Sequence, residues 1–206
     1  MTPRHRTCVL ALLFAILAVP ASAQRQVPPP PLPDDWSHGT VLTALGGIGT
    51  DTSDPGLAAG GAIGWELAPR VAIEGSALWL DDAAGADGFN AALKVRAGLR
   101  EAGVSPFVEG GVGLYHVSTT AGPETMPGFY SRRMVTAAKG ATVTQSFTDP
   151  SFHIGAGINV FMSRHIALQP AVEAIIVTAD SQSYTLTAFT VRVAYHFEDH
   201  PVTRSR

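Results

Sequence analysis

The stretch Thr187–Phe197, TAFTVRVAYHF, decides the fold. Its residues alternate between two faces: one carries Phe189, Val191, Val193, Tyr195 and Phe197, and the other carries Ala188, Thr190, Arg192, Ala194 and His196. A period of two residues predicts a β-strand. Because one face is apolar and the other includes a charge, the pattern indicates the wall of a transmembrane β-barrel, with lipid outside and a polar lumen inside.

The first 23 residues are interpreted as a secretory signal peptide. Arg4 and Arg6 precede the unbroken apolar run Val9–Val19, and the small residues Ala21–Ala23 form a cleavage site. This run is shorter than the roughly 20 residues that a membrane-spanning helix needs, so we expect cleavage rather than anchoring. Cys8 is the single cysteine, and the mature chain is therefore expected to have no disulfide.

The rest of the chain is predicted to be one domain with two short flanking segments. Residues 24–36, which include VPPPPLP, predict an extended proline-rich linker, residues 37–197 the barrel, and residues 198–206 a C-terminal tail. Charged residues make up 15% of the chain, whereas a soluble domain has about a quarter. The net charge is −3 and no run of Lys or Arg suggests a nucleic-acid partner.

Eight stretches of alternating residues predict an all-β, antiparallel, up-and-down transmembrane barrel of eight strands. Each has about the length of a tilted strand that crosses a bilayer. Short and long connections alternate between them, as expected for periplasmic turns and external loops. The predicted strands are Thr40–Gly49, Leu57–Leu67, Val71–Leu80, Phe89–Arg100, Ser105–Val117, Phe152–Met162, Ile166–Val177 and Tyr184–Phe197.

One face of these strands carries charged side chains that antiparallel pairing brings together. The expected partners are Arg96 with Glu109, Glu74 with Arg96, Glu173 with Arg192, and Asn159 with Gln169. An eight-stranded barrel is just wide enough for side chains to fill it, so a salt-bridge plug is the main prediction and a gate the alternative. The predicted lumen charges are Glu66, Glu74, Lys94, Arg96, Glu109, Glu173 and Arg192.

The opposite face is apolar and is predicted to contact lipid. Large aromatic side chains near the strand ends, such as Trp65, Trp79, Phe89 and Phe152, fit two interfacial girdles. Glycines that cluster on the strands are expected to relieve crowding in a small barrel, since no phosphate-binding motif contains them. A soluble barrel or sandwich with these apolar residues in its core is the alternative.

Catalytic, metal and cofactor sites are not predicted. The pairs Ser151–His153 and His116–Ser118 lie near outer strand ends and share a face, which keeps a serine hydrolase as an alternative, but no third residue is evident. The paired carboxylates have cationic neighbours, which argues against acid–base catalysis. The seven histidines show no metal-binding spacing.

The long connection Ser118–Ser151 is the best candidate for a surface-binding loop. It contains the basic residues Arg132, Arg133 and Lys139, which could meet anionic lipopolysaccharide or another partner. Within it, Met134–Phe147 is interpreted as a hairpin that extends the two flanking strands above the membrane.

These features resemble the eight-stranded outer-membrane β-barrel family, which includes OmpA-like transmembrane domains and small porin-family proteins. The resemblance covers roughly residues 37–197 and rests on the signal peptide, on Pro106–Tyr115 (PFVEGGVGLY), on Phe152–Val160 (FHIGAGINV) and on the final strand. It implies that the aromatic end of that strand, Tyr195 and Phe197, is the signal read by the barrel-assembly machinery.

The sequence therefore predicts a monomeric protein of the bacterial outer membrane, non-enzymatic and without a cofactor, with an envelope-structural or surface-interaction role. Outer-membrane lipid, lipopolysaccharide and the barrel-assembly machinery are the expected partners. A narrow pore for small solutes, a lipid A-modifying barrel enzyme and a soluble periplasmic barrel that binds an apolar ligand are the alternatives.

Overall fold

The computed structural model describes residues 39–50, 55–68, 70–82, 86–99, 104–119, 128–133, 144–163 and 165–197. The predicted signal peptide, the proline-rich linker, the tail 198–206 and Lys139 lie outside these ranges. The described chain forms eight strands and one short helix, α2 (Gly128–Ser131). The strands are β1 (Thr40–Thr50), β2 (Pro55–Ala68), β3 (Val71–Asp82), β4 (Ala86–Gly98), β5 (Val104–Thr119), β6 (Gln145–Phe161), β7 (Ile166–Ala179) and β8 (Gln182–His196).

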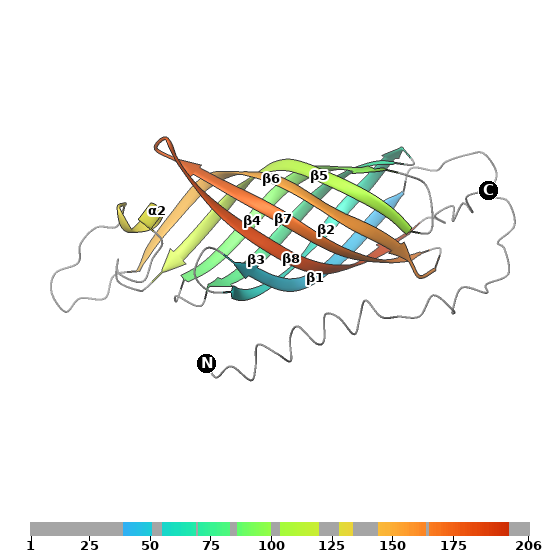
Figure 1. Ribbon diagram of the computed structural model, residues 1–206, viewed down its shortest axis with the longest axis horizontal. Helices are drawn as coiled ribbons and strands as arrows, with labels where there is room; N and C mark the ends of the chain where they lie inside the picture. The colour runs from blue at the N-terminus through green and yellow to red at the C-terminus, as the bar shows by residue number, and fades with distance from the viewer. Residues whose placement is uncertain are drawn as a thin grey trace, which may run out of the picture. The chain divides into compact units, whose positions relative to one another are not determined.

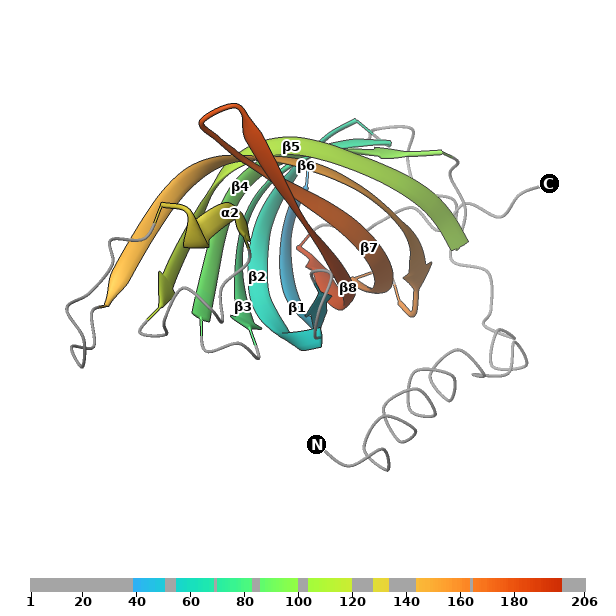
Figure 2. The same cartoon turned by 60° about the vertical axis from the view of Figure 1, so that its left-hand side comes forward.

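The strands form one closed antiparallel barrel in chain order, and this confirms the predicted fold class. Each strand pairs with the next, and β8 closes the ring against β1 from Val41 opposite His196 to Thr50 opposite Thr187. Figure 1 shows the strands crossing the barrel at a tilt, and Figure 2 shows the wall curving round. No helix among the described residues is long and apolar enough to cross a membrane.

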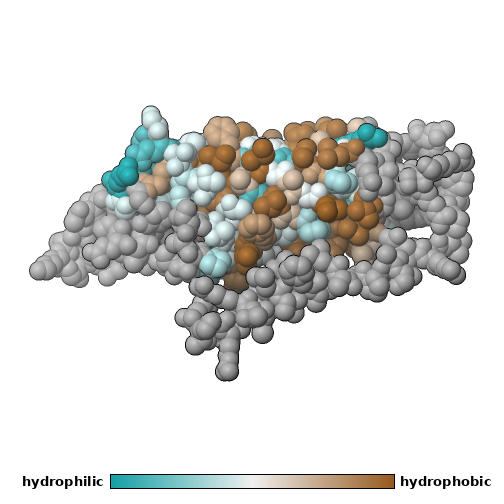
Figure 3. Space-filling model, in the orientation of Figure 1, coloured by the Kyte–Doolittle hydropathy of each residue, from teal (hydrophilic) through white to brown (hydrophobic). Residues whose placement is uncertain are grey.

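The side chains of each strand alternate between exposed and buried, as the two-residue period predicts. On β8 the outward residues Phe189, Val193 and Tyr195 are exposed, whereas Arg192 and Ala194 are buried. The other strands repeat this pattern, and apolar side chains dominate the middle of the outer wall (Figure 3). Hydrophilic residues gather at the end of the wall where the β7–β8 turn lies. The apolar band is therefore on the outside of the barrel.

Two of the predicted hairpin registers are wrong. Glu74 lies opposite Lys94 rather than Arg96, and Arg192 lies opposite Gln169 rather than Glu173. These shifts amount to even numbers of residues, so every side chain stays on its predicted face. The predicted pair of Arg96 with Glu109 is confirmed. The β6–β7 ladder, which includes Val160 opposite Leu168, has the register predicted for Asn159 and Gln169.

The register differences arise because the predicted external loops are partly strand. The expected loop Thr178–Ser183 is a two-residue turn, in which Asp180 and Ser181 have φ values of 49° and 63°. Positive φ at both central residues suits the twist of a tight β-hairpin. Strands β3 and β4 likewise pair as far as Asp82 opposite Ala86. The prediction ended each strand where apolar alternation ended, but backbone pairing continues without apolar side chains.

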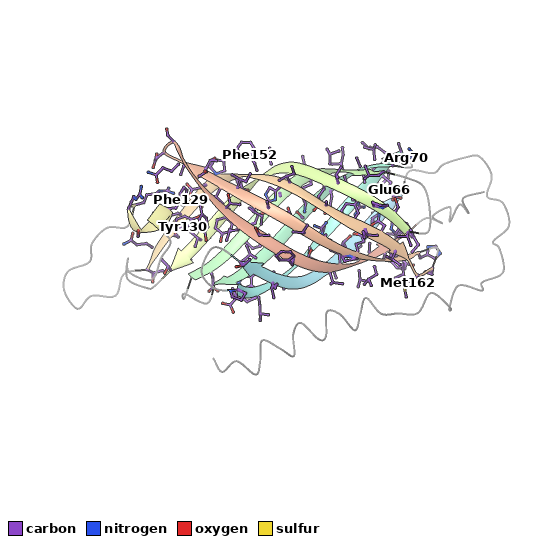
Figure 4. The ribbon with its side chains drawn as sticks, in the orientation of Figure 1. Glu66, Arg70, Phe129, Tyr130, Phe152 and Met162 are labelled. Atoms are coloured by element: carbon purple, nitrogen blue, oxygen red, sulfur yellow. The ribbon has the colours of Figure 1, made fainter. Side chains whose placement is uncertain are left out.

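The two ends of the barrel differ. The chain enters β1 and leaves β8 at one end, which we call the terminal end, and the long β5–β6 connection lies at the other, which we call the loop end. Figure 4 places Phe129 and Tyr130 of α2 at the loop end, and Glu66, Arg70 and Met162 at the terminal end. Helix α2 was not predicted, since residues 118–151 were interpreted as a loop with a hairpin.

Candidate functional site

The middle of the barrel interior is filled by a layer of interlocked charges, which we call the charged layer: Glu74, Lys94, Arg96, Glu109, Glu173 and Arg192. Arg192, which is 1% exposed, donates from Nη1 to Glu109 Oε2 at 2.8 Å and from Nη2 to Glu109 Oε1 at 2.5 Å. Lys94 Nζ donates to both carboxylate oxygens of Glu173 at 3.3 Å. Bidentate, charge-assisted hydrogen bonds of this kind are the strong ones in proteins.

The remaining members of the layer complete a balanced set of charges. Glu74, which is 2% exposed, has Arg96 at 3.6 Å, Lys94 at 3.8 Å and Arg192 at 3.9 Å. Arg96 donates to Gln169 Oε1 at 3.2 Å. Three carboxylates thus face three cations in the charged layer. Buried charges need such partners, because removing one partner leaves the other uncompensated at low dielectric.

The charged layer leaves little open space. A cavity of about 10 Å³ is lined by Lys94, Glu173 and Arg192 of this layer, together with Leu45, Ser76, Leu78, Asn90 and Thr190. This volume is close to that of one water-sized probe. Inward-facing glycines allow the close packing: Gly155 lies opposite Glu109 and Gly111 opposite Lys94. A Cβ at residue 111 would lie 2.7 Å from Lys94 Cγ.

A chain of hydrogen bonds leads from the charged layer toward the loop end. Glu173 Oε1 lies 2.6 Å from His153 Nδ1, and His153 Nε2 lies 3.1 Å from Ser151 Oγ. Asn90 Nδ2 donates to Ser151 Oγ at 3.0 Å. All four side chains are at most 5% exposed. This is the order of groups in a Ser–His–acid triad.

Sequence reasoning singled out Ser151 and His153 but missed their partners. The signal was available in the β6–β7 register, since Glu173 lies opposite Gly155, one inward position from His153. Asn90 could not be found in this way, because its strand β4 is not adjacent to β6. The other candidate pair is not brought together in this manner: His116 Nδ1 lies 2.8 Å from Thr148 Oγ1 at an exposed position.

The loop-end half of the interior is apolar, which the sequence analysis did not predict. We call this cluster the apolar layer. Helix α2 covers it: Tyr130 is 1% exposed, and its ring lies 5.7 Å from Phe147 and 4.8 Å from Phe129. The buried members of the layer are Ala58, Leu78, Leu80, Tyr115, Val117, Phe129, Tyr130, Ile175, Val177, Leu186 and Ala188.

We call helix α2 together with Arg133 the cap. An ion pair holds the cap against the barrel wall. Arg133 Nη1 donates to Asp149 Oδ2 at 2.6 Å, and its guanidinium lies over the rings of Phe129 and Phe147 at 5.8 and 4.8 Å. The hydrogen bond to Asp149 raises the pKa of Arg133. Burial, together with Tyr115 and Asp149, raises the pKa of Tyr130 above its ordinary value. In the closed cap, Arg133 is therefore charged and Tyr130 is neutral.

The other predicted site residues lie at the two ends. Glu66 is separate from the charged layer and has His196 Nδ1 3.4 Å from its Oε1 at the terminal end. Tyr195 and Phe197 are exposed on the outer wall with their rings 5.2 Å apart. Arg132 donates to Gln182 Oε1 at 3.3 Å at an exposed position. No group of three or more His, Cys, Asp and Glu among the described residues is placed to hold a metal ion.

A closed eight-stranded barrel with an apolar outer band and charged interior defines a transmembrane β-barrel protein. The chain belongs to the outer membrane protein beta-barrel domain family, whose model matches residues 9–197. The protein is accordingly a protein of the bacterial outer membrane. Comparison with curated proteins finds no significant match.

Solved structures share the fold at low sequence identity. The N-terminal β-barrel domain of Pseudomonas aeruginosa OprF is 15% identical with a TM-score of 0.55, and 78% of this chain and 100% of that chain are covered. Neisserial surface protein A is 8% identical with a TM-score of 0.57, covering 78% and 97%. OprG from Pseudomonas aeruginosa is 10% identical with a TM-score of 0.50, covering 78% and 96%.

Proposed function

We propose that this protein is a closed, non-conducting outer-membrane barrel that acts in envelope structure or in interaction at the cell surface. The observation that carries the proposal is the filled interior. Charged side chains occupy the middle with a cavity of about 10 Å³, and the apolar layer with its cap occupies the loop end. A conducting pore needs a continuous open path lined by polar groups, whereas the charged layer is filled by its own side chains and the loop-end layer is apolar.

The surface role is assigned to the loop end, which faces outward when short turns lie in the periplasm. There the Arg133–Asp149 pair, Pro150 and residues Thr178–Ser183, which comprise the β7–β8 turn and the strand ends beside it, line an open hollow. Arg132 donates a hydrogen bond to Gln182, the first residue of β8. The hollow thus joins cationic, acidic and amide groups, a set suited to a polar partner such as the sugar and phosphate groups of lipopolysaccharide.

In the closed state no substrate reaches Ser151, which is 1% exposed, and the closed barrel is therefore not catalytic. The protein is taken to act as a monomer, with outer-membrane lipid around its apolar band. The exposed aromatic residues Tyr195 and Phe197 on the final strand are proposed as the signal for the barrel-assembly machinery.

Ion conductance tests the closed interior. The folded protein in a planar lipid bilayer is expected to give no steady current, and liposomes that contain it are expected not to swell in small sugars. The double variant Arg192→Ala/Glu109→Ala empties part of the charged layer. Combined with removal of the cap, it should conduct ions. Glu66→Ala, at the terminal end, is the matched control. Steady conductance by the unmodified barrel would favour the narrow pore.

A further inference from the structure

The hydrogen-bond chain Glu173–His153–Ser151 is not needed to neutralise the charged layer. The charged layer is balanced without it, because three carboxylates already face three cations. Glu173 already has Lys94 and Arg192 within 3.4 Å. His153 adds a third partner to a carboxylate that is already compensated, and it does so on the side that faces Ser151.

We propose that Ser151 is the nucleophile of a latent acyl-transfer centre that the α2 cap closes, and that its substrates are esters of long-chain carboxylic acids. This inference goes beyond the closed-barrel function, which concerns the shut state alone. It rests on the 3.1 Å and 2.6 Å contacts of His153 and on the apolar layer that lies directly against them.

The contacts fix the role of each group. In the neutral tautomer that carries its proton on Nδ1, His153 donates to Glu173 and presents Nε2 to the Ser151 hydroxyl as a proton acceptor. Glu173 touches no substrate and is a positioning residue. The Asn90 amide, at 3.0 Å from Ser151 Oγ, is the nearest donor that could stabilise an oxyanion formed at the serine.

The surroundings select the acyl group. Ser151 lies opposite Val177, and His153 lies opposite Ile175, both of which are fully buried in the apolar layer. From there the layer continues through Leu78, Leu80 and Tyr115 to the cap. An alkyl chain could replace the cap's own aromatic side chains in this layer, whereas the charged layer on the other side of His153 would exclude it.

The cap controls entry because it contributes side chains to the same layer. Phe129 and Tyr130 are buried there, and the tether Arg133–Asp149 is partly exposed, with 27% of the Arg133 side chain accessible. Release of this ion pair would let α2 move away without unpairing any strand. Opening of this kind is how a lid exposes a site that is otherwise sealed from water.

The reaction would proceed in two steps, acylation and deacylation of Ser151. Ser151 Oγ attacks the ester carbonyl and passes its proton to His153 Nε2. The bond from the carbonyl carbon to the alkoxy oxygen then breaks, and the leaving alcohol takes the proton from His153. Water, deprotonated by His153 Nε2, then attacks the acyl carbon. The bond from this carbon to Ser151 Oγ breaks, the carboxylic acid leaves, and Oγ takes the proton from His153 to restore the hydroxyl.

A long-chain alkyl fluorophosphonate tests this inference on the folded full-length barrel. Reaction at Ser151 would form a phosphorus–oxygen bond, release fluoride and pass the serine proton to His153. We expect mass spectrometry to find the label on Ser151 and Ser151→Ala to remove it, whereas Ser105→Ala, another buried hydroxyl, should leave it unchanged. His153→Gln should slow labelling about 100-fold, the size of a general-base contribution.

Variants of the cap distinguish a catalytic site that is closed from a hydrogen-bond chain that has no catalytic function. Phe129→Ala/Tyr130→Ala and Arg133→Ala should each raise the labelling rate and the hydrolysis of long-chain p-nitrophenyl esters over p-nitrophenyl acetate. Heat-modifiable gel mobility reports whether each variant is folded. If neither the native barrel nor the folded Arg133→Ala variant is labelled at Ser151, the hydrogen-bond chain is only structural and the inference is wrong. Conductance is a separate readout, so this failure would leave the closed-barrel function standing.

Discussion

Phe107 and Gly157 lie opposite each other on β5 and β6, and the ring of Phe107 occupies the space in which a side chain at residue 157 would begin. A Cβ at residue 157 would lie 2.5 Å from Phe107 Cζ and 2.7 Å from the carbonyl oxygen of Pro170. The Phe107 ring is 1% exposed and lies 5.6 Å from the guanidinium of Arg96. The glycine thus makes room for a large inward side chain.

Replacement of Gly157 by valine should therefore destabilise the barrel by about 1–3 kcal/mol, the usual cost of overpacking. Urea unfolding in detergent, followed by heat-modifiable mobility, would measure the change in free energy. Gly46→Val is the matched control, because a Cβ at residue 46 meets nothing within 4 Å. Equal destabilisation by the two variants would contradict the packing argument.

Truncation of one partner in the charged layer should cost much more than loss of a rim charge. Arg192→Leu leaves Glu109 buried without its bidentate partner, and we expect a loss of about 3–5 kcal/mol in unfolding free energy. Adding Glu109→Leu should recover part of that loss, because the uncompensated charge is then gone. Arg132→Leu, at the exposed rim, should change stability by less than about 1 kcal/mol. A double variant as unstable as the sum of the single variants would refute the coupling.

A charge on the outer wall should also be costly. Val172 lies on the outward face of β7 and is 40% exposed. Val172→Arg should reduce the unfolding free energy in lipid by about 2–4 kcal/mol, as expected near the bilayer midplane. The control Val172→Leu should be nearly neutral. An arginine that is tolerated equally well would mean that Val172 does not face lipid.

The cap is expected to loosen in alkali. Burial raises the pKa of Tyr130 above its ordinary value, so the closed cap favours the neutral phenol. The contribution of the neutral Tyr130 phenol to the stability of the closed cap is fully present below about pH 10, the pKa of an exposed tyrosine. It falls as the pH rises from there toward the raised pKa of Tyr130 in the closed state. Proteolysis within residues 128–133 should therefore accelerate above this pH. Tyr130→Phe, which has no proton to lose, should remove that acceleration.

Loss of the final aromatic residue should impair assembly. The backbone N–H of Phe197 donates to Thr40 O at 3.0 Å at the closing seam, while its side chain is exposed on the wall. Phe197→Ala keeps the backbone bond but removes the ring, so the amount of folded protein in the outer membrane should fall. Val193→Ala on the same face is the control. Unchanged levels of folded Phe197→Ala would contradict the proposed assembly signal.

Much of this architecture is determined by alternation, which is a local property of the sequence. Residues such as Arg192 and Phe189 could be assigned to opposite faces because neighbours on a strand point in opposite directions. The partners of a charge were harder to predict, as Glu74 and Lys94 illustrate. Their pairing depends on where the turn is placed, and a shift of two residues changes the partner without changing the face.

The capped apolar layer and the Ser151–His153–Glu173 chain depend on contacts across the barrel. Asn90 reaches Ser151, and Lys94 reaches Glu173, between strands that are not neighbours in the sheet. Such contacts follow from barrel diameter and stagger rather than from any local pattern. The inward position of Tyr115 followed from alternation, but its packing with an unforeseen helix did not.

Closure of the ring by β1 and β8 makes completion of this protein a single late event. Seven of the eight strand pairs join neighbours along the chain, whereas Thr40–Thr50 must find Thr187–His196 from the opposite end of the domain. Until that seam forms, two strands present unpaired backbone edges that would recruit other chains. The loss of chain entropy on bringing the two ends of the domain together occurs in this one step. The edge of the first strand must therefore stay protected until synthesis reaches β8, and a chain that ends before Thr187 lacks the partner of β1 and cannot close.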